Sequence, residues 1–209
     1  MRKSSWVVVT AAVVVSGCAG MSAEECQLAD WETIGYEDGV RGASGSAIAN
    51  HRKACAKAGV APDRVAYERG RASGLESYCR PANGYQVGQS GHGYSGVCPA
   101  DIEGAFLDAY YEGKELYRLR SDVSQLSAKL NYQEKELERG KDHMLDIEKA
   151  LISEGLAPAE RIALLADLKE ASREIGETEQ KLIELEREKA VATVKLHEFQ
   201  EGSYSASLQ

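Results

Sequence analysis

The second half of this chain carries an apolar residue at every seventh position, and this repeat limits the possible fold more than any other feature. The first row of the repeat has no gap: Leu116, Val123, Leu130, Leu137, Met144 and Leu151. A companion row, Leu119, Leu126 and Ile147, is interrupted by Gln133 and Gly140. Two apolar rows at heptad spacing are typical of helices packed in a coiled coil.

A break at about residues 153–159 divides the repeat into two arms. Gly155 suits the end of one helix, and Pro158 suits the first position of the next. The pattern then resumes at Leu164 and continues to Phe199, with Lys189 as an interruption. We therefore predict an antiparallel helical hairpin over residues 115–200, with arms about 60 Å long. The alternative is a straight helix that dimerises in parallel, and Pro158 argues against it.

The polar residues on the apolar rows weaken the hairpin as an isolated structure. A partner protein, a second copy or the preceding half of the chain is expected to cover part of it.

Residues 26–114 have a different composition and are predicted to form a separate domain of short helices. Residues 19–114 hold 15 of the 20 glycines, and a Tyr-x-x-Gly motif occurs four times, at residues 36–39, 67–70, 85–88 and 110–113. Residues three apart share one face of a helix, and a glycine beside a ring lets another backbone approach closely. We therefore interpret the motif as a packing feature.

The glycines and prolines also place the helix boundaries of this domain. We predict helices over about 31–39, 46–58 and 62–79, with the first two paired as a hairpin, and a fourth helix that opens at Pro99. Residues 81–96 are predicted to be a tight glycine-rich loop, with a small β-hairpin as the alternative. Residues 201–209 are expected to be a flexible tail.

Four cysteines, Cys26, Cys55, Cys79 and Cys98, are available for disulfides, and they allow three pairings. A bridge from Cys55 to Cys79 is disfavoured, because a helix of about 24 Å would separate them and a disulfide needs Cα atoms within about 7 Å. We prefer Cys26–Cys55 with Cys79–Cys98. A zinc site that includes His51 or His92 is the alternative, but the chain has no Cys-x-x-Cys spacing to support it.

The N-terminus reads as an export signal over residues 1–17. Arg2 and Lys3 precede a short apolar run, and Val15-Ser16-Gly17-Cys18 then resembles the lipobox of bacterial lipoproteins. This resemblance implies cleavage before Cys18, acylation of its sulfur and new amino group, and a linker over residues 18–25. Ala19 in the next position implies the outer membrane. The alternative is an ordinary cleaved signal with Cys18 as a spare thiol.

The charge balance excludes one class of partner. Loss of Arg2 and Lys3 with the signal leaves 23 basic and 33 acidic residues, a net charge of about −10. Nucleic-acid binding needs clustered Lys and Arg, so we expect none. Anionic lipid would repel such a surface, so the acyl group is expected to provide the membrane anchor.

No sequence motif for catalysis is present, and we predict no enzyme activity, no cofactor and no metal site. The candidate binding residues are polar and aromatic side chains of the first half, where a carboxylate beside a histidine could act as an acid–base pair. Mutual ion pairs between small helices are the simpler interpretation. The candidates are Asp38, His51, Arg71 and Tyr78, with Tyr85 and Tyr94 on the glycine-rich loop.

A family resemblance extends over residues 26–117. It depends on a string of short matches: Asp30-Trp31, Gly35, Asp38-Gly39, His51 to Cys55, Gly59-Val60, Pro62-Asp63, Tyr67 to Arg71, Gly74-Leu75, Tyr78-Cys79, Asn83 to Tyr85, Tyr94 to Pro99, Phe106, Tyr110 and Gly113. Together they resemble an uncharacterised family of Gram-negative lipoproteins, the domain of unknown function 2799. The resemblance implies a lipoprotein, and it brings no activity with it.

We therefore expect a mainly α-helical lipoprotein that faces the periplasm, with a small disulfide-bonded domain followed by a helical hairpin. The predicted function is that of a non-enzymatic interaction or scaffold protein whose hairpin reaches an envelope protein. The alternative is a glycan-binding protein or small hydrolase with a site around His51, Arg71 and residues 81–96. Convergence of His51, Arg71 and Tyr78 on one open pocket would favour that alternative.

Overall fold

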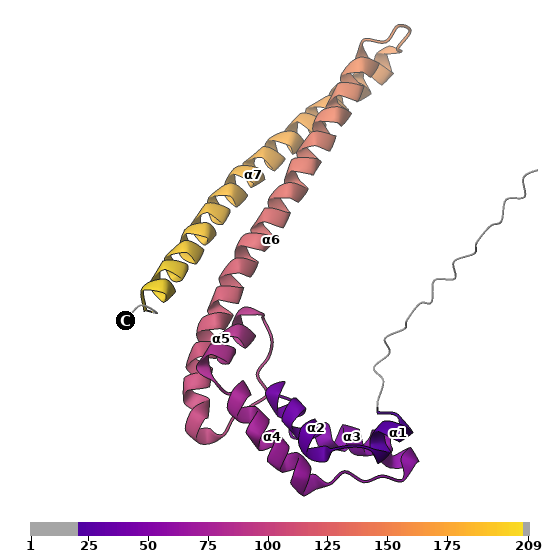
Figure 1. Ribbon diagram of the computed structural model, residues 1–209. Helices are drawn as coiled ribbons and strands as arrows, with labels where there is room; N and C mark the ends of the chain where they lie inside the picture. The colour runs from indigo at the N-terminus through magenta and orange to yellow at the C-terminus, as the bar shows by residue number, and fades with distance from the viewer. Residues whose placement is uncertain (1–20, 207–209) are drawn as a thin grey trace, which may run out of the picture. The chain divides into compact units, whose positions relative to one another are not determined.

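The computed structural model describes residues 21–206, and within them the chain is helical with no β-strand (Figure 1). This confirms the predicted fold class, a mainly α protein with two disulfides followed by a long hairpin. Two compact units are present. Among the described residues, the first contains 21–80 together with 94–103, and the second contains 81–93 and 104–206.

The first unit is built from helices α1 (Ala23–Gln27), α2 (Trp31–Val40), α3 (Ala47–Cys55) and α4 (Arg64–Tyr78), with a short 3₁₀ helix, η1 (Ala56–Ala58), after α3. Asp30 accepts the amides of Glu32 and Thr33 at the start of α2. Asp63 caps α4 in the same way, so Pro62 precedes this helix and does not begin it. Residues 18–25 are not linker throughout, because Ser22 and Glu25 form a capping box that starts α1.

Helices α2 and α4 pack along each other with their backbones in contact. A Cβ atom added to Gly35 would overlap the carbonyl oxygen of Tyr67, and one added to Gly70 would overlap that of Glu32. Gly39 and Gly74 make the next contact along the pair. The predicted hairpin of the first two helices is therefore corrected: α2 pairs with α4, because the glycines of both helices face each other.

The core of the first unit lies between α1, α2, α3 and α4, where Cys26, Trp31, Cys55 and Tyr67 are buried together. Disulfides join Cys26 to Cys55 and Cys79 to Cys98, the pairing preferred from the sequence. The two bridges span 29 and 19 residues. Closing loops of that length stabilises a fold by about 3 kcal/mol each in the chain-entropy model.

The second unit begins with a helix where a loop was predicted. Residues Pro81–Gln89 form α5, and only the residues after it are irregular. Gly84 and Gly88 lower the helix propensity of this stretch, but both lie against the backbone of α6 (Ala100–Leu151) beside Phe106 and Tyr110. Side chains at these two positions would prevent that contact, so tertiary packing explains both the glycines and the helix.

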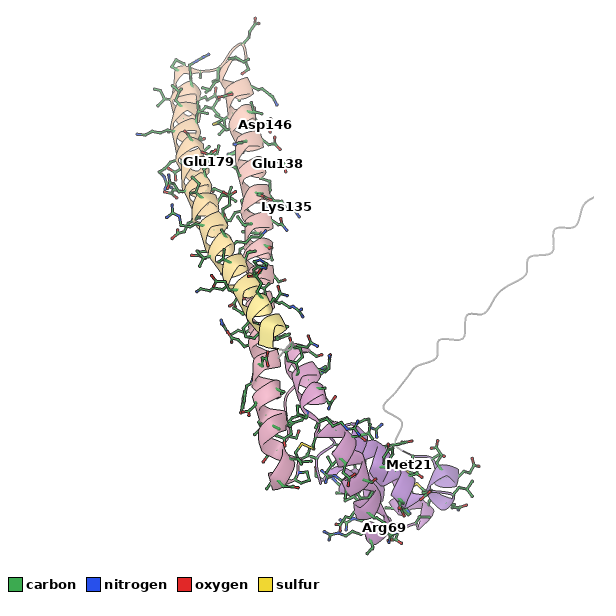
Figure 2. The ribbon with its side chains drawn as sticks, turned by 60° about the vertical axis from the view of Figure 1, so that its left-hand side comes forward. Met21, Arg69, Lys135, Glu138, Asp146 and Glu179 are labelled. Atoms are coloured by element: carbon green, nitrogen blue, oxygen red, sulfur yellow. A yellow bond between two sulfur atoms is a disulfide. The ribbon has the colours of Figure 1, made fainter. Side chains whose placement is uncertain are left out.

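The hairpin of the second unit consists of α6 and α7 (Pro158–Ala206) (Figures 1 and 2). Figure 2 shows Glu179 on α7 beside the stretch of α6 that carries Glu138 and Asp146. Lys141 forms an ion pair with Glu179 at 3.4 Å. Near the other end of the hairpin, Ser203 donates a hydrogen bond to Glu112 at 2.7 Å. The two arms thus keep one antiparallel register along their length.

The predicted apolar rows face each other in this hairpin. On α6 the first row is buried or half-buried throughout, and its companion row includes the buried Leu119 and Ile147. The half-buried or buried positions of α7 follow the heptads and are Leu164, Leu168, Ala171, Ile175, Thr178, Leu182, Leu185, Lys189, Ala192, Leu196 and Phe199, with Ser203 beyond them. Gly140 makes room for Ile175, whose side chain would lie 3.3 Å from an added Cβ.

Two boundaries differ from those expected. α6 continues without a break through the domain boundary predicted at residue 114/115, because the heptad rows begin within a helix that had already started at Ala100. Residues 201–206, expected to be a tail, continue α7, where Ser203 is held by Glu112. Cys18 and residues 207–209 lie outside the described residues.

Candidate functional site

Asp38 is the centre of the most concentrated polar cluster in the first unit. It lies on α2 and is only 3% exposed. Its carboxylate accepts hydrogen bonds from the Tyr67 hydroxyl at 2.7 Å, the Arg41 guanidinium at 2.6 Å and Nε2 of His51 at 2.8 Å. The cluster therefore connects three elements, α2, α3 and α4, through one buried carboxylate.

The environment of Asp38 favours its ionised form. Burial alone would raise the pKa of this carboxyl, but hydrogen bonds from Tyr67, His51 and Arg41 outweigh burial and lower the pKa below its usual value. The pKa of Tyr67 is raised, first by burial of its hydroxyl and then by its hydrogen bond to Asp38. Both groups are thus held in their ordinary ionisation states, with Asp38 charged and Tyr67 neutral, as in a structural hydrogen bond.

Arg71 extends the polar region toward the surface. It donates a hydrogen bond to the carbonyl oxygen of Ala43 at 2.9 Å, which ties α4 to the turn after α2. Its Nε is buried and lacks a hydrogen-bond partner among the described residues. A cavity of about 270 Å³ lies beside it, also lined by Arg64 and Tyr67. A space of this size admits a few waters, and water can satisfy such a nitrogen.

The predicted candidates do not converge on one open pocket. His51 binds Asp38, Arg71 binds Ala43, and the ring of Tyr78 lies under Gly42, which has a φ of +66°. A Cβ at Gly42 would overlap that ring, so the glycine is required by both its conformation and the contact. These three side chains are therefore used in separate packing contacts of the first unit.

Tyr85 and Tyr94, the two tyrosines of the predicted loop, lie in different units. Tyr94 donates a hydrogen bond to Glu103 at 2.8 Å and accepts the Cys98 amide at 2.9 Å, so it orders the segment next to the second disulfide. Tyr85 lies on α5 in the second unit, where it lines a groove of about 590 Å³ together with Leu116 and Phe199.

Sequence reasoning missed two of the three partners of Asp38. Arg41 follows Asp38 by three residues, a helical spacing that could have indicated the ion pair. Tyr67 was noted only as part of a Tyr-x-x-Gly motif, and nothing in its local sequence predicts a contact with a residue 29 positions away.

Three further observations bear on metals and membranes. No group of three or more His, Cys, Asp or Glu side chains within residues 21–206 is arranged to hold a metal ion. His143 and His197 are exposed on the hairpin. No helix in the same part of the chain is both long and apolar enough to cross a lipid bilayer.

Comparison with known sequences finds a family match in the first half of the chain. No curated protein and no solved structure matches the chain. Residues 30–115 match the model of a family described as "Protein of unknown function (DUF2799)". This range covers α2, α4 and α5, the start of α6 and the Asp38 cluster. Residues 30–115 of the chain are therefore similar to the DUF2799 family.

Proposed function

We propose that this protein is a non-enzymatic scaffold of the bacterial cell envelope, held at the outer membrane by a lipid on Cys18 and facing the periplasm. Its hairpin binds a protein partner through the end that carries the turn. The polar side chains of the first unit support a structural role for that unit, because Asp38, His51 and Arg71 bind one another or the backbone.

The observation that carries this proposal is the position of the exposed apolar residues on the hairpin. Four large apolar side chains gather within about two turns of the residues that connect α6 to α7. They are Leu145, Ile152, Ile162 and Leu165, which are 48%, 83%, 69% and 52% exposed. Exposed apolar clusters on a soluble surface mark contact sites for other proteins.

The outer surface of the arms between these residues and the other end of the hairpin is mainly charged, although Tyr132, Ile183, Val191 and Val194 are also exposed there. Ile152 and Ile162, next to the turn, are more exposed than any of these four. Ion pairs within single helices, such as Arg118 with Asp122 and Arg173 with Glu170, occupy much of it. Such pairs keep a helix solvated and contribute little to affinity. The turn is therefore the region of the hairpin best suited to bury surface against a partner.

Replacing Ile152 and Ile162 together by aspartate is expected to abolish partner binding without unfolding the hairpin, because both side chains are exposed. The measurement is formaldehyde crosslinking in intact cells, followed by purification of the protein and mass spectrometry of its adducts. A specific adduct should form with the wild-type protein and fall at least about tenfold with the double variant.

The matched control is Ile183→Asp, which changes an exposed isoleucine in the middle of α7. This variant should keep the adduct at the wild-type level. An adduct that survives the double variant, or that is lost equally in the control, would contradict a contact at the turn.

A further inference from the structure

We propose that residues 31–117 contain the same helix pair twice, and that the first copy has an exposed face that binds a helix of another envelope protein. The first copy is α2 with α4, and the second is α5 with the start of α6. This proposal is independent of the contact at the hairpin turn, because it concerns a different surface in a different unit.

The same glycine contacts occur in both copies. In each copy, two glycines four residues apart on the first helix lie against two carbonyl oxygens four residues apart on the second helix. The matched contacts are Gly35 with Tyr67 and Gly84 with Phe106, then Gly39 with Arg71 and Gly88 with Tyr110. Tyr67 and Phe106 are both fully buried.

The reverse contacts match as well. A Cβ on Gly74 would lie 2.8 Å from the amide nitrogen of Val40, and one on Gly113 would lie 2.8 Å from that of Gln89. Gly113 therefore corresponds to Gly74. The Tyr-x-x-Gly motif at residues 110–113 therefore matches residues 71–74 of the first copy. The motif at residues 67–70 lies one helical turn before them.

The turn after the first helix is also repeated. Gly42 and Gly91 have φ values of +66° and +74°, and each lies against a tyrosine ring of the second helix, Tyr78 and Tyr117. In both copies, the carbonyl oxygen of the residue after this glycine accepts a hydrogen bond from a side chain of the second helix. Ala43 accepts from Arg71 at 2.9 Å, and His92 accepts from Tyr110 at 3.1 Å. Contacts that agree at this many positions indicate one structural unit built twice.

The copies differ in what covers one face. In the second copy, Tyr85, Gln89 and Leu116 line a groove whose other wall is the end of α7, with Phe199 and Ser203. Ser203 donates a hydrogen bond to Glu112 in that groove, and Leu116 is buried. In the second copy, this face is thus packed against the end of α7.

In the first copy, the corresponding residues are Tyr36, Val40, Ser73 and Ser77. Tyr36 and Val40 lie one turn apart on α2 and are 45% and 41% exposed. The backbone geometry beneath them is the same as in the second copy. The expected occupant is therefore a partner helix that presents an aromatic ring and a hydroxyl one turn apart, as Phe199 and Ser203 do. The two serines can hydrogen-bond that hydroxyl in place of Glu112.

A fluorescent peptide with the sequence of residues 190–206 is a suitable probe, because it carries this pattern. Its binding to the purified full-length protein is measured by fluorescence anisotropy. Saturable binding is expected. It should weaken at least about tenfold in Tyr36→Asp and in Val40→Asp, because each change places a charge on the exposed face.

Val65→Asp is the matched control, because Val65 is exposed on α4 outside this face, and binding should remain unchanged. Thermal unfolding of each variant shows whether a loss of binding reflects a loss of fold. Val40→Asp is the deciding variant if Tyr36→Asp unfolds. Absence of saturable binding would contradict the proposal. So would binding that survives Tyr36→Asp and is lost in Tyr85→Asp, because the peptide would then occupy the second copy.

Discussion

Replacing Gly70 by alanine is expected to destabilise the first unit by about 3 kcal/mol, the upper end of the cost of overpacking a core. The added Cβ would overlap the carbonyl oxygen of Glu32 and lie 2.9 Å from the amide nitrogen of Tyr36. Both atoms belong to the backbone of α2, so no side-chain rotation can relieve the overlap. The helices must separate, and the contact at Gly74 is then lost as well.

The measurement is urea or thermal unfolding of the purified protein with its disulfides intact. Gly176→Ala is the matched control, because Gly176 lies in α7 with no atom within 4 Å of an added Cβ. That variant should be slightly more stable, since alanine favours a helix over glycine by up to about 1 kcal/mol. Equal stability of Gly70→Ala and the wild type would refute the backbone contact between α2 and α4.

Replacing Asp38 by alanine is the second large effect, with an expected loss of about 3 kcal/mol in the free energy of unfolding. The change removes the acceptor of three hydrogen bonds and leaves the hydroxyl of Tyr67 buried without its partner. α3 should also loosen, because His51 joins it to Asp38. Hydrogen exchange should show faster exchange at the α3 amides than in the wild type.

The pH dependence of this effect follows from the lowered pKa of Asp38. A carboxyl whose pKa is lower in the folded state stabilises the fold above its unfolded pKa of about 3.9 and loses this contribution as the pH falls through its folded pKa. The difference in the free energy of unfolding between the wild type and Asp38→Asn should have its full size at pH 5 and shrink below about pH 4. Urea unfolding at pH 7, 5 and 3 measures it, and a gap that widens in acid would contradict the assignment.

The features predicted best from the sequence are those encoded by local periodicity. The heptad rows placed Leu130 and Ile147 in the hairpin seam and Gly155 in its turn, because an apolar stripe on a long helix has one way to be buried. The preferred cysteine pairs are confirmed, although the preference for Cys26–Cys55 relied on a hairpin of the first two helices, and α2 pairs with α4 instead.

Features that depend on distant contacts could not be predicted in the same way. Residues 81–89 were expected to be a loop because Gly84 and Gly88 oppose helix formation, and only the backbone of α6 explains why they are helical. The pairing of α2 with α4 and the contact from Tyr67 to Asp38 join residues 29 or more positions apart. The glycines signalled close packing, but not which helices would meet.

The most direct test of the proposed function is site-specific photocrosslinking in intact cells, with the photoreactive residue placed at position 152 in one strain and at position 183 in another. The scaffold proposal predicts a covalent adduct with one envelope protein from position 152 and none from position 183. Adducts from position 183 alone, or only with a second copy of the chain, would contradict a partner-binding site at the turn of the hairpin.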